Sequence, residues 1–392
     1  MLKTKCKESL YDVIGEKVCP GKTPFFNLKK EPLKTISFDW DRGGWNNVRM
    51  GVETMLCIAK IFNRALVLPE PRRWYLLNEK AHLFDFYDEA SFKSFVPVYI
   101  KPKEGAVKDF SDEIVTNSQG KVNVKLLKKY KNYDHWHFPM RTRMFSYFPL
   151  GFPRPGRFFS LIKSSLRIKN SLIDEACKRL EENNLELVKY VALHVRKNDF
   201  QYKSKNISAE DIVNKVTKSI EKNIPILILS DVYNEELISL FEDKGHRVVC
   251  WSQKGKDSLC FKNHPSTGKI YRTESKESIV IDMLCGVPAK RFFGSFSSSF
   301  SSYIPHMRGL LSNIYPEIDT SILYTGPGNK NNPTWWSYVD ENYWEKNRLK
   351  KFRNYLNRKI MEIDKIKFRK KCEKRRAKRI KAEKEKLTKD LK

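Results

Sequence analysis

The amino-acid sequence predicts an α/β protein with two doubly wound domains, and three observations support this prediction. Short apolar runs alternate with segments of helical periodicity, which is the pattern of parallel sheets. The pattern occurs once near the N-terminus and again after about residue 165. The chain of 392 residues is too long for one ordinary core. We therefore expect two Rossmann-like domains that face each other across a cleft, with ligands beyond the carboxyl ends of the strands.

The first domain is predicted from a strand, a glycine-rich turn, a helix and a second strand. TISFDW (35–40) is typical of a strand, and residues 46–63 carry apolar side chains at helical spacing. RALVLPEP (64–71) is typical of a short buried strand that ends at proline. Residues 1–32 are expected to wrap the surface. Residues 72–160 are rich in aromatic side chains but weakly periodic, so they predict no clear element.

The second domain is predicted from a longer alternation of the two patterns. Helical spacing or a capping serine predicts helices at residues 164–183, 208–223, 234–245 and 276–287. Apolar runs between them predict strands at residues 189–200, 224–232, 246–252 and 290–295. We therefore expect an N-terminal domain at 1–163, a second domain at 164–344 that includes a closing segment at 333–344, and a tail at 345–392.

The tail is much more basic than the rest of the chain, whose formal net charge is +29. Residues 345–392 hold 22 Lys and Arg and 7 Asp and Glu, a net charge of +15. A basic helical or disordered tail of this kind can contact nucleic acid or an anionic surface. The alternative is a solvated helical extension without such a partner.

The cysteines and the N-terminus favour a cytoplasmic protein. The eight Cys show no CxxC spacing, which makes a zinc ribbon a poor fit. Cys57 and Cys285 fall in apolar, helix-like stretches and are expected to be buried thiols. The N-terminus has no apolar core of a signal peptide, and no run of eighteen apolar residues predicts a transmembrane helix. The even number of cysteines permits disulfides, but without a signal peptide we expect a reduced compartment and reduced cysteines.

The stretch FDWDRGGWNNVRMGVE (38–53) is the first candidate site. Asp39 and Asp41 match an Asp-x-Asp metal pattern, but no further ligands are visible, so no metal site is predicted. Gly43 and Gly44 allow an anion to approach the backbone, and a helix from Asn46 offers free N–H groups to phosphate. A tight turn with an Asn cap explains the same residues.

Two histidines in DHWHFP (134–139) form a second pattern with metal-binding potential. No acidic or Cys partner lies at a recognisable spacing, so packing or hydrogen bonding is the preferred interpretation.

Two later stretches carry polar residues where a strand ends. HVRKNDF (194–200) places His194, Arg196 and Asp199 at a strand terminus, where Arg can pair with a diphosphate and stabilise a departing nucleotide. A surface ion pair between Arg196 and Asp199 is the alternative. In GSFSSSFSSYIPHMRG (294–309), hydroxyls and a helix N-terminus can bind phosphate oxygens, or form a common Ser-capped helix start.

Together and in this order, these stretches resemble the GDP-fucose protein O-fucosyltransferase superfamily. GGWNNVRM is similar to its Gly-Gly-x-Asn-x-x-Arg segment, and LHVRKNDF to its His-x-Arg-x-x-Asp-Phe motif. RFFGSFSSSFSSYI resembles its glycine- and serine-rich segment, and Asp282 lies at a fitting distance before it. The likeness spans roughly residues 35–310.

The resemblance implies a GT-B fold and an inverting, metal-independent transfer of fucose from GDP-fucose to a Ser or Thr of a protein, without any cofactor. It implies that Arg196 contacts the β-phosphate and assists its departure, and that Asp282 reads the guanine. The other implied substrate-binding residues are Gly43, Gly44, Asn46, Asn47, Arg49, His194, Asp199, Ser298, Ser299 and Phe300.

The sequence also departs from the family. Some members carry a Glu before the Gly-aromatic-Asn triplet, proposed as the base, whereas Gly43 occupies that place here. Asp41 is the nearest carboxylate and becomes the candidate catalytic base. Many relatives enter the secretory pathway, which is an alternative to the cytoplasm.

Two alternative functions remain open at this stage. The same fold can move fucose onto a glycan or use another donor, such as a rhamnose nucleotide. A basic protein that binds nucleic acid or a membrane surface through its tail, with a vestigial sugar-nucleotide pocket, is an alternative of another class.

Overall fold

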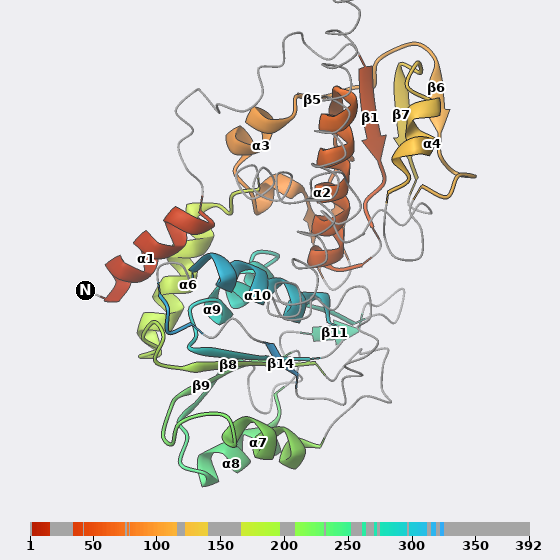
Figure 1. Cartoon of the computed structure of the whole chain (residues 1–392). Coiled ribbons are helices and arrows are strands. Elements are labelled where there is room, and N and C mark those ends of the chain that lie inside the picture. Colours follow the sequence, from red (N-terminus) through yellow and green to blue (C-terminus); the bar gives the residue numbers. More distant parts are fainter. Residues whose placement is uncertain are drawn as a thin grey trace, which may run out of the picture. The chain divides into compact units, whose positions relative to one another are not determined.

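Two parallel β-sheets, each with helices packed on it, organise the protein (Figure 1). The computed structural model describes residues 2–15, 34–41, 43–74, 77, 79–115, 122–139, 166–196, 208–230, 233–251, 261–263, 270–272, 275–295, 298–311, 315–318 and 322–324. All of them belong to one compact unit, residues 1–339. The expected α/β class with two parallel sheets is confirmed. The predicted boundary at 163, the closing segment and the basic tail lie outside the described residues.

The first sheet has β1 at its centre and is parallel throughout. Its strands stand in the order β5 (Val98–Tyr99), β2 (Arg64–Val67), β1 (Lys34–Phe38), β7 (His135–Phe138) and β6 (Val107–Asp109). The chain runs from β1 to β2 and β5 on one side, and β6 and β7 then fill the other side. The strand order therefore reverses between β1 and β7, which is where parallel sheets of this kind bind ligands.

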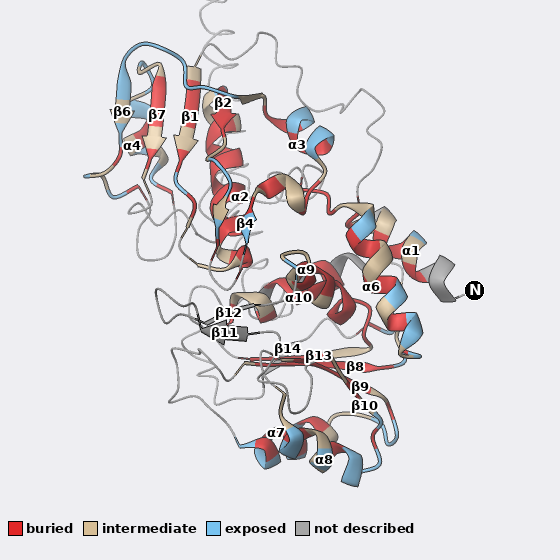
Figure 2. Cartoon of the chain, turned by 180° about the vertical axis from the view of Figure 1, so that it is seen from behind, coloured by how far each residue is buried: buried red, intermediate tan, exposed pale blue. Residues whose placement is uncertain are grey.

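Helix α2 (Trp45–Phe62) supplies most of the core of this half. Its apolar side chains pack against Ile36 and Phe38 of β1 and Leu66 of β2, and Figure 2 shows this helix buried along most of its length. The helix ends at Asn63, whose φ of 50° is left-handed and closes the last turn. The predicted strand–turn–helix–strand order is confirmed with small shifts at the element ends.

The weakly periodic stretch contains several short elements that the sequence did not predict. These are β3 (Arg72–Arg73), β4 (Lys80–Ala81), a 3-10 helix (Leu83–Asp85), α3 (Glu89–Phe95), α4 (Val124–Lys129), and the strands β5, β6 and β7. None exceeds seven residues, too short for a clear period to develop.

The second sheet has the strand order β10 (Val248–Cys250), β9 (Ile226–Ser230), β8 (Val191–Val195), β13 (Arg291–Gly294) and β14 (Ile322–Tyr324). All its pairings are parallel. The chain fills β8, β9 and β10 in one direction before β13 and β14 add to the other side. The order therefore reverses between β8 and β13.

Helices cover both faces of the second sheet, which explains why its strands are apolar on both sides. Val191, Leu193 and Val195 of β8 pack with α7 (Ala209–Thr217) and α8 (Glu235–Asp243). Ala192, between them, belongs to the larger core that holds α6 (Asn170–Glu182), α9 (Ser278–Gly286) and α10 (Ser299–Leu311). The strands β11 (Phe261–Asn263) and β12 (Ile270–Arg272) form a separate antiparallel pair.

An N-terminal helix, α1 (Leu2–Val13), packs on α6 and was not predicted. A disulfide joins Cys6 of α1 to Cys177 of α6, with a Cα–Cα distance of 6.1 Å. The Arg167 side chain donates hydrogen bonds to the carbonyls of Tyr11 (2.7 Å) and Val13 (2.8 Å) at the end of α1. The expectation of reduced cysteines is therefore wrong for this pair.

The expected buried thiols at Cys57 and Cys285 are confirmed. Within the described part of the chain, no helix is both long and apolar enough to span a membrane.

Candidate active site

A buried hydrogen-bond network joins the ends of β8 and β13, the two strands between which the order reverses. The Ser295 hydroxyl donates to the carbonyl of His194 (2.9 Å) and accepts the backbone N–H of Arg196 (3.0 Å). The backbone N–H of Ser295 donates to the hydroxyl of Ser301 on α10 (2.9 Å). Ser295 therefore fixes the point at which the chain leaves β8, and with it the backbone of Arg196.

His194 is held as a neutral imidazole within this network. Its Nδ1 lies 2.6 Å from the Ser301 hydroxyl oxygen, and its ring centroid lies 4.6 Å from that of Phe300. Burial, and then the charge of Arg196, lower the pKa of His194 to about 3. Because the Ser301 oxygen accepts from Ser295, its own proton is available to Nδ1. We infer that Nε2 carries the ring proton and is a hydrogen-bond donor.

Ser298 precedes α10 and has an unsatisfied hydroxyl. The residue is only 2% exposed, and its Oγ has no hydrogen-bond partner among the described residues. A buried hydroxyl without a partner is rare in native proteins and needs an explanation. At the start of a helix of 13 residues, the hydroxyl and the backbone N–H groups of the first turn can bind an anion.

Gly294 allows α10 to lie close to β13. A Cβ atom at Gly294 would lie 2.9 Å from the Cβ of Ser301, which is shorter than real contacts allow. The close packing of α10 on β13 therefore explains why a glycine stands in the Gly-Ser-Phe-Ser stretch. It brings the Ser301 hydroxyl within reach of both Ser295 and His194.

The second candidate stretch forms a tight turn before α2. The backbone N–H of Gly43 donates to Asp41 Oδ1 (2.6 Å), and the Asn47 side chain also bonds this carboxylate. A Cβ atom at Gly43 would lie 2.2 Å from Asn47 Nδ2, so a larger residue here would displace the Asn47 side chain. Gly44 is the N-cap residue of α2, and as a glycine it makes no side-chain cap hydrogen bond. Burial raises the pKa of Asp41, while Gly43, Asn47 and Arg72 oppose this rise.

Arg49 is buried and connects this stretch to α10. Its guanidinium forms an ion pair with Glu53 and donates from Nε to Asn46 Oδ1 at 3.4 Å. The Arg49 Cζ also lies 3.5 Å from the ring centroid of Tyr303 on α10. The ring of Trp45 lies 6.0 Å from the same tyrosine. The described contacts of Arg49 therefore hold two helices together, and its predicted contact with substrate stays a prediction.

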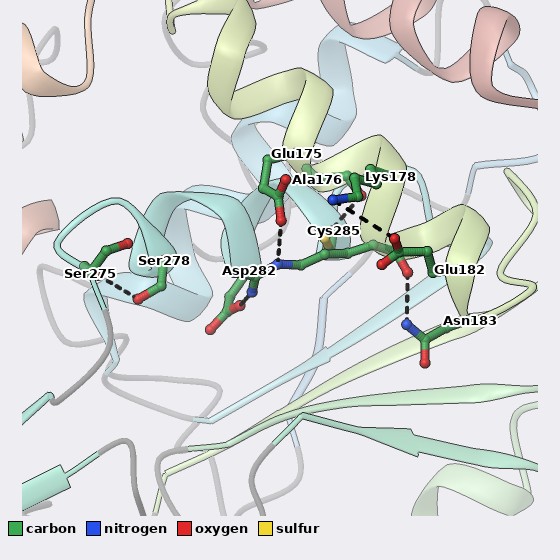
Figure 3. A network of polar contacts seen from close by, with 10 residues as sticks. Glu175, Ala176, Lys178, Glu182, Asn183, Ser275, Ser278, Asp282 and Cys285 are labelled. Carbon is green, nitrogen blue, oxygen red and sulfur yellow. Dashed lines mark hydrogen bonds and ion pairs between the residues drawn. The ribbon is translucent and has the colours of Figure 1, made fainter.

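Asp282 lies on α9 and pairs with a cation that the sequence analysis did not single out. Its Oδ1 is 3.2 Å from Nη1 of Arg179 on α6, and Arg179 Nε lies 3.4 Å from Glu175. Figure 3 shows Glu175 and Asp282, which come from two different helices and both pair with Arg179. Arg179 also lies 5.8 Å from the ring of Trp251, after β10. The ion pair of Asp282 with Arg179 does not bear on guanine recognition, so that role of Asp282 stays a prediction.

The structure thus brings several predicted residues together. His194, Arg196, Ser298, Ser299 and Phe300 gather where β8 and β13 end, whereas Asp199 lies outside the described residues.

Ser295, Ser301, Tyr303 and Arg179 were missed as site residues by the sequence analysis. The hydrogen-bond partners of the two serines lie 6 to 107 positions away in the chain, so no local spacing reveals them. Within the described residues, no three His, Cys, Asp or Glu side chains gather as a metal-binding group.

Comparison with known proteins gives one family match. Residues 36–223 match the family model described as GDP-fucose protein O-fucosyltransferase. No curated protein matches the chain.

Solved structures of fucosyltransferases are similar to the chain at low identity. POFUT1 in complex with GDP is 13% identical over 76% of this chain and 100% of its own, with a TM-score of 0.43. POFUT1 in complex with GDP-fucose is 14% identical over 76% and 100%, with a TM-score of 0.42. The selenomethionine form of NodZ from Bradyrhizobium is 12% identical over 69% and 91%, with a TM-score of 0.45.

Proposed function

Residues 36–223 place the chain in the GDP-fucose protein O-fucosyltransferase family, and on this premise we propose that it transfers fucose from GDP-fucose to a protein. The acceptor group is the hydroxyl of Ser or Thr, and the reaction inverts the configuration at the sugar carbon. The observation that carries the proposal is the buried Ser298 hydroxyl just before α10, which has no hydrogen-bond partner in the part of the chain that the structure describes.

The leaving group is GDP, whose diphosphate gains negative charge as the sugar bond breaks. The Ser298 hydroxyl and the first N–H groups of α10 are donors for these phosphate oxygens, as Ser299 and Phe300 begin the helix. Arg196 adds a positive charge at the same strand end. Donors and charges that are in place before the reaction stabilise the transition state without reorganisation. We assign to Arg196 the role of contacting the β-phosphate and assisting its departure with GDP.

The neutral state of His194 suits a nucleotide site. A proton on Nε2 makes this ring a donor to a phosphate or ribose oxygen, while Ser301 holds Nδ1. His194 lies at the switch point between β8 and β13, and α/β folds bind nucleotides at such points. Asp199 is proposed to support this motif.

The remaining parts of the proposed site bind the guanine and the sugar of the donor. We propose that Asp282 reads the guanine and that Arg179, its ion-pair partner, orients the carboxylate. Gly43, Gly44, Asn46 and Asn47 are proposed to line the sugar end, where the turn held by Asp41 lets a ligand approach the backbone. The reaction is proposed to need no metal and no cofactor.

A thermal-shift and binding panel tests the donor assignment. GDP, GDP-fucose, GDP-mannose, UDP and UDP-rhamnose are each added to the wild type with EDTA present. A ligand at 100 times its dissociation constant should stabilise the protein by about 2.7 kcal/mol. A shift with GDP and GDP-fucose alone supports the proposal. A shift only with the uridine nucleotides contradicts the donor, and no shift with any nucleotide contradicts the function.

Variants connect this binding to the named residues. Ser298→Ala and Arg196→Ala should each weaken the GDP shift. Arg247→Ala is the matched control, because Arg247 bonds the carbonyls of Asn183 and Asn184 at the opposite end of the sheet. Turnover should fall roughly 10²- to 10³-fold for Arg196→Ala if its charge stabilises the departing diphosphate. If GDP stabilised all three variants equally, Ser298 and Arg196 would not belong to the GDP-binding site.

A further inference from the structure

Two sequence motifs that the proposed function leaves unused meet in the first sheet. Asp39 comes from Asp-Trp-Asp after β1, and His137 comes from His-Trp-His on β7. The His137 Nε2 lies 4.0 Å from Asp39 Oδ1, and the Asp39 backbone N–H donates to the Phe138 carbonyl (2.9 Å). The two strands are those between which the order of this sheet reverses. The pair therefore occupies a position where α/β sheets bind ligands.

A chain of hydrogen bonds supports His137 from within the sheet. The Ser37 hydroxyl lies 2.9 Å from His137 Nδ1 and 2.9 Å from His135 Nε2. His135 Nδ1 lies 2.8 Å from the Thr35 hydroxyl, which accepts the backbone N–H of Lys103 at 2.8 Å. The paired residues of adjacent parallel strands point to the same face, which explains why these side chains meet.

We propose that His137, supported by Asp39, is the base that takes the proton from the acceptor hydroxyl. The inference rests on the proposed function, because it supplies the proton acceptor which that reaction needs. The acceptor oxygen attacks C1 of fucose, and a new C1–O bond forms. The bond from C1 to the phosphate oxygen breaks, and its electron pair leaves with GDP. The hydroxyl proton moves to Nε2 of His137, and the solvent takes it after the product leaves.

The hydrogen-bond chain can hold the tautomer that this step requires. A basic Nε2 requires the ring proton on Nδ1, which then donates to the Ser37 oxygen. The Ser37 hydroxyl donates its hydrogen bond to His135 Nε2, and His135 Nδ1–H donates to the Thr35 hydroxyl oxygen. Each bond then contains one proton, and the Thr35 oxygen uses its two lone pairs for His135 and Lys103.

The two histidines differ in their surroundings. Burial, followed by His137 and Arg64, lowers the pKa of His135 to about 4, so this ring stays neutral near pH 7. The imidazolium formed at His137 has the carboxylate of Asp39 beside it. Because the pKa of His135 is lowered, the proton does not move inward to that ring.

Both members of the pair can be reached from solvent. The side chain of His137 is 31% exposed, and that of Asp39 is 47% exposed. A protein acceptor needs such access, because its hydroxyl arrives on a folded domain or a peptide.

Asp41, by contrast, already has partners within its own turn. One oxygen accepts from Gly43, and the Asn47 side chain bonds the carboxylate. We assign to it the shape of the turn. Since burial raises its pKa, which also suits a base, the experiment must compare the two residues.

The experiment measures turnover of GDP-fucose by the full chain. Transfer of labelled fucose to a random Ser/Thr peptide library and release of GDP in water are followed for the wild type, His137→Gln, His137→Ala and Asp41→Asn. Gln keeps a polar side chain but cannot take the proton. His246→Asn is the control, because Asn can still donate to the Ile224 carbonyl that His246 Nδ1 contacts at 3.0 Å. GDP affinity is measured for each variant.

The inference predicts a separation of turnover from donor binding. His137→Gln should lower kcat by about 10²- to 10⁴-fold with unchanged GDP affinity, and imidazole should partly restore His137→Ala. His246→Asn should stay within about threefold of the wild type, and Asp41→Asn should lose less kcat than His137→Gln. A His137→Gln variant with near-normal kcat, or a loss confined to Asp41→Asn, overturns the inference while the proposed function stands. A wild type that turns over no GDP-fucose in either assay overturns both.

Discussion

The acid sensitivity of the protein should depend on His194. This ring is buried beside Arg196, and its pKa is about 3 in the folded chain against an ordinary 6.5. Above pH 6.5 both the folded and the unfolded states hold the ring neutral, so its contribution is fully present. Below 6.5 only the unfolded state takes up the proton, and stability is lost progressively until pH 3.

The size of the effect follows from this difference in pKa. At pH 5 the solution is about 1.5 pH units below the unfolded pKa, and each unit corresponds to about 1.36 kcal/mol. His194 should therefore remove about 2 kcal/mol of unfolding free energy between pH 8 and pH 5. Burial of the ring, followed by the positive charge of Arg196, explains the cost of protonation.

Urea unfolding at pH 8, 7, 6 and 5 measures this effect. In His194→Asn the amide oxygen can still accept from Ser301, but the side chain does not titrate. Its unfolding free energy should fall by about 2 kcal/mol less than that of the wild type over this range. Phe300→Leu is the control, since it removes the ring contact with His194 but keeps the titrating group. Parallel losses in the wild type and His194→Asn would refute the reasoning.

Three further perturbations test the packing of the site and the fold. Gly294→Ala should cost about 1–3 kcal/mol in urea unfolding, because the added methyl meets Ser301; an unchanged midpoint would show that α10 moves away freely. Arg49→Met should cost about 3–5 kcal/mol by leaving Glu53 buried without its partner, whereas Arg49→Met with Glu53→Leu should recover most of the loss; equal stability of the single and double variants would contradict this. Reduction of the Cys6–Cys177 disulfide, which spans 171 positions, should lower the unfolding free energy by about 2–5 kcal/mol, and a Cys6→Ala, Cys177→Ala variant should not respond to reductant.

The sequence by itself determined the long elements and their alternation. The helix of 46–63 and the strands around it were predicted to within a few residues, because apolar periodicity over one long segment reflects burial on one face. The same holds for most of the second sheet, whose apolar runs report burial on both faces. The ends of β8 and β13, at Val195 and Gly294, also follow from sequence, since polar residues directly succeed apolar runs.

Only the tertiary structure decided which distant residues meet. Ser301 bonds His194 across 107 positions, and Asp39, directly after β1, lies beside His137 of β7. Both contacts depend on strand order. The pairing of Cys6 with Cys177 depends on the packing of α1 against α6, which no cysteine spacing encodes. Short strands such as β6 and β7 gain their stability from neighbours in the sheet, so their own residues carry too little periodicity to predict them.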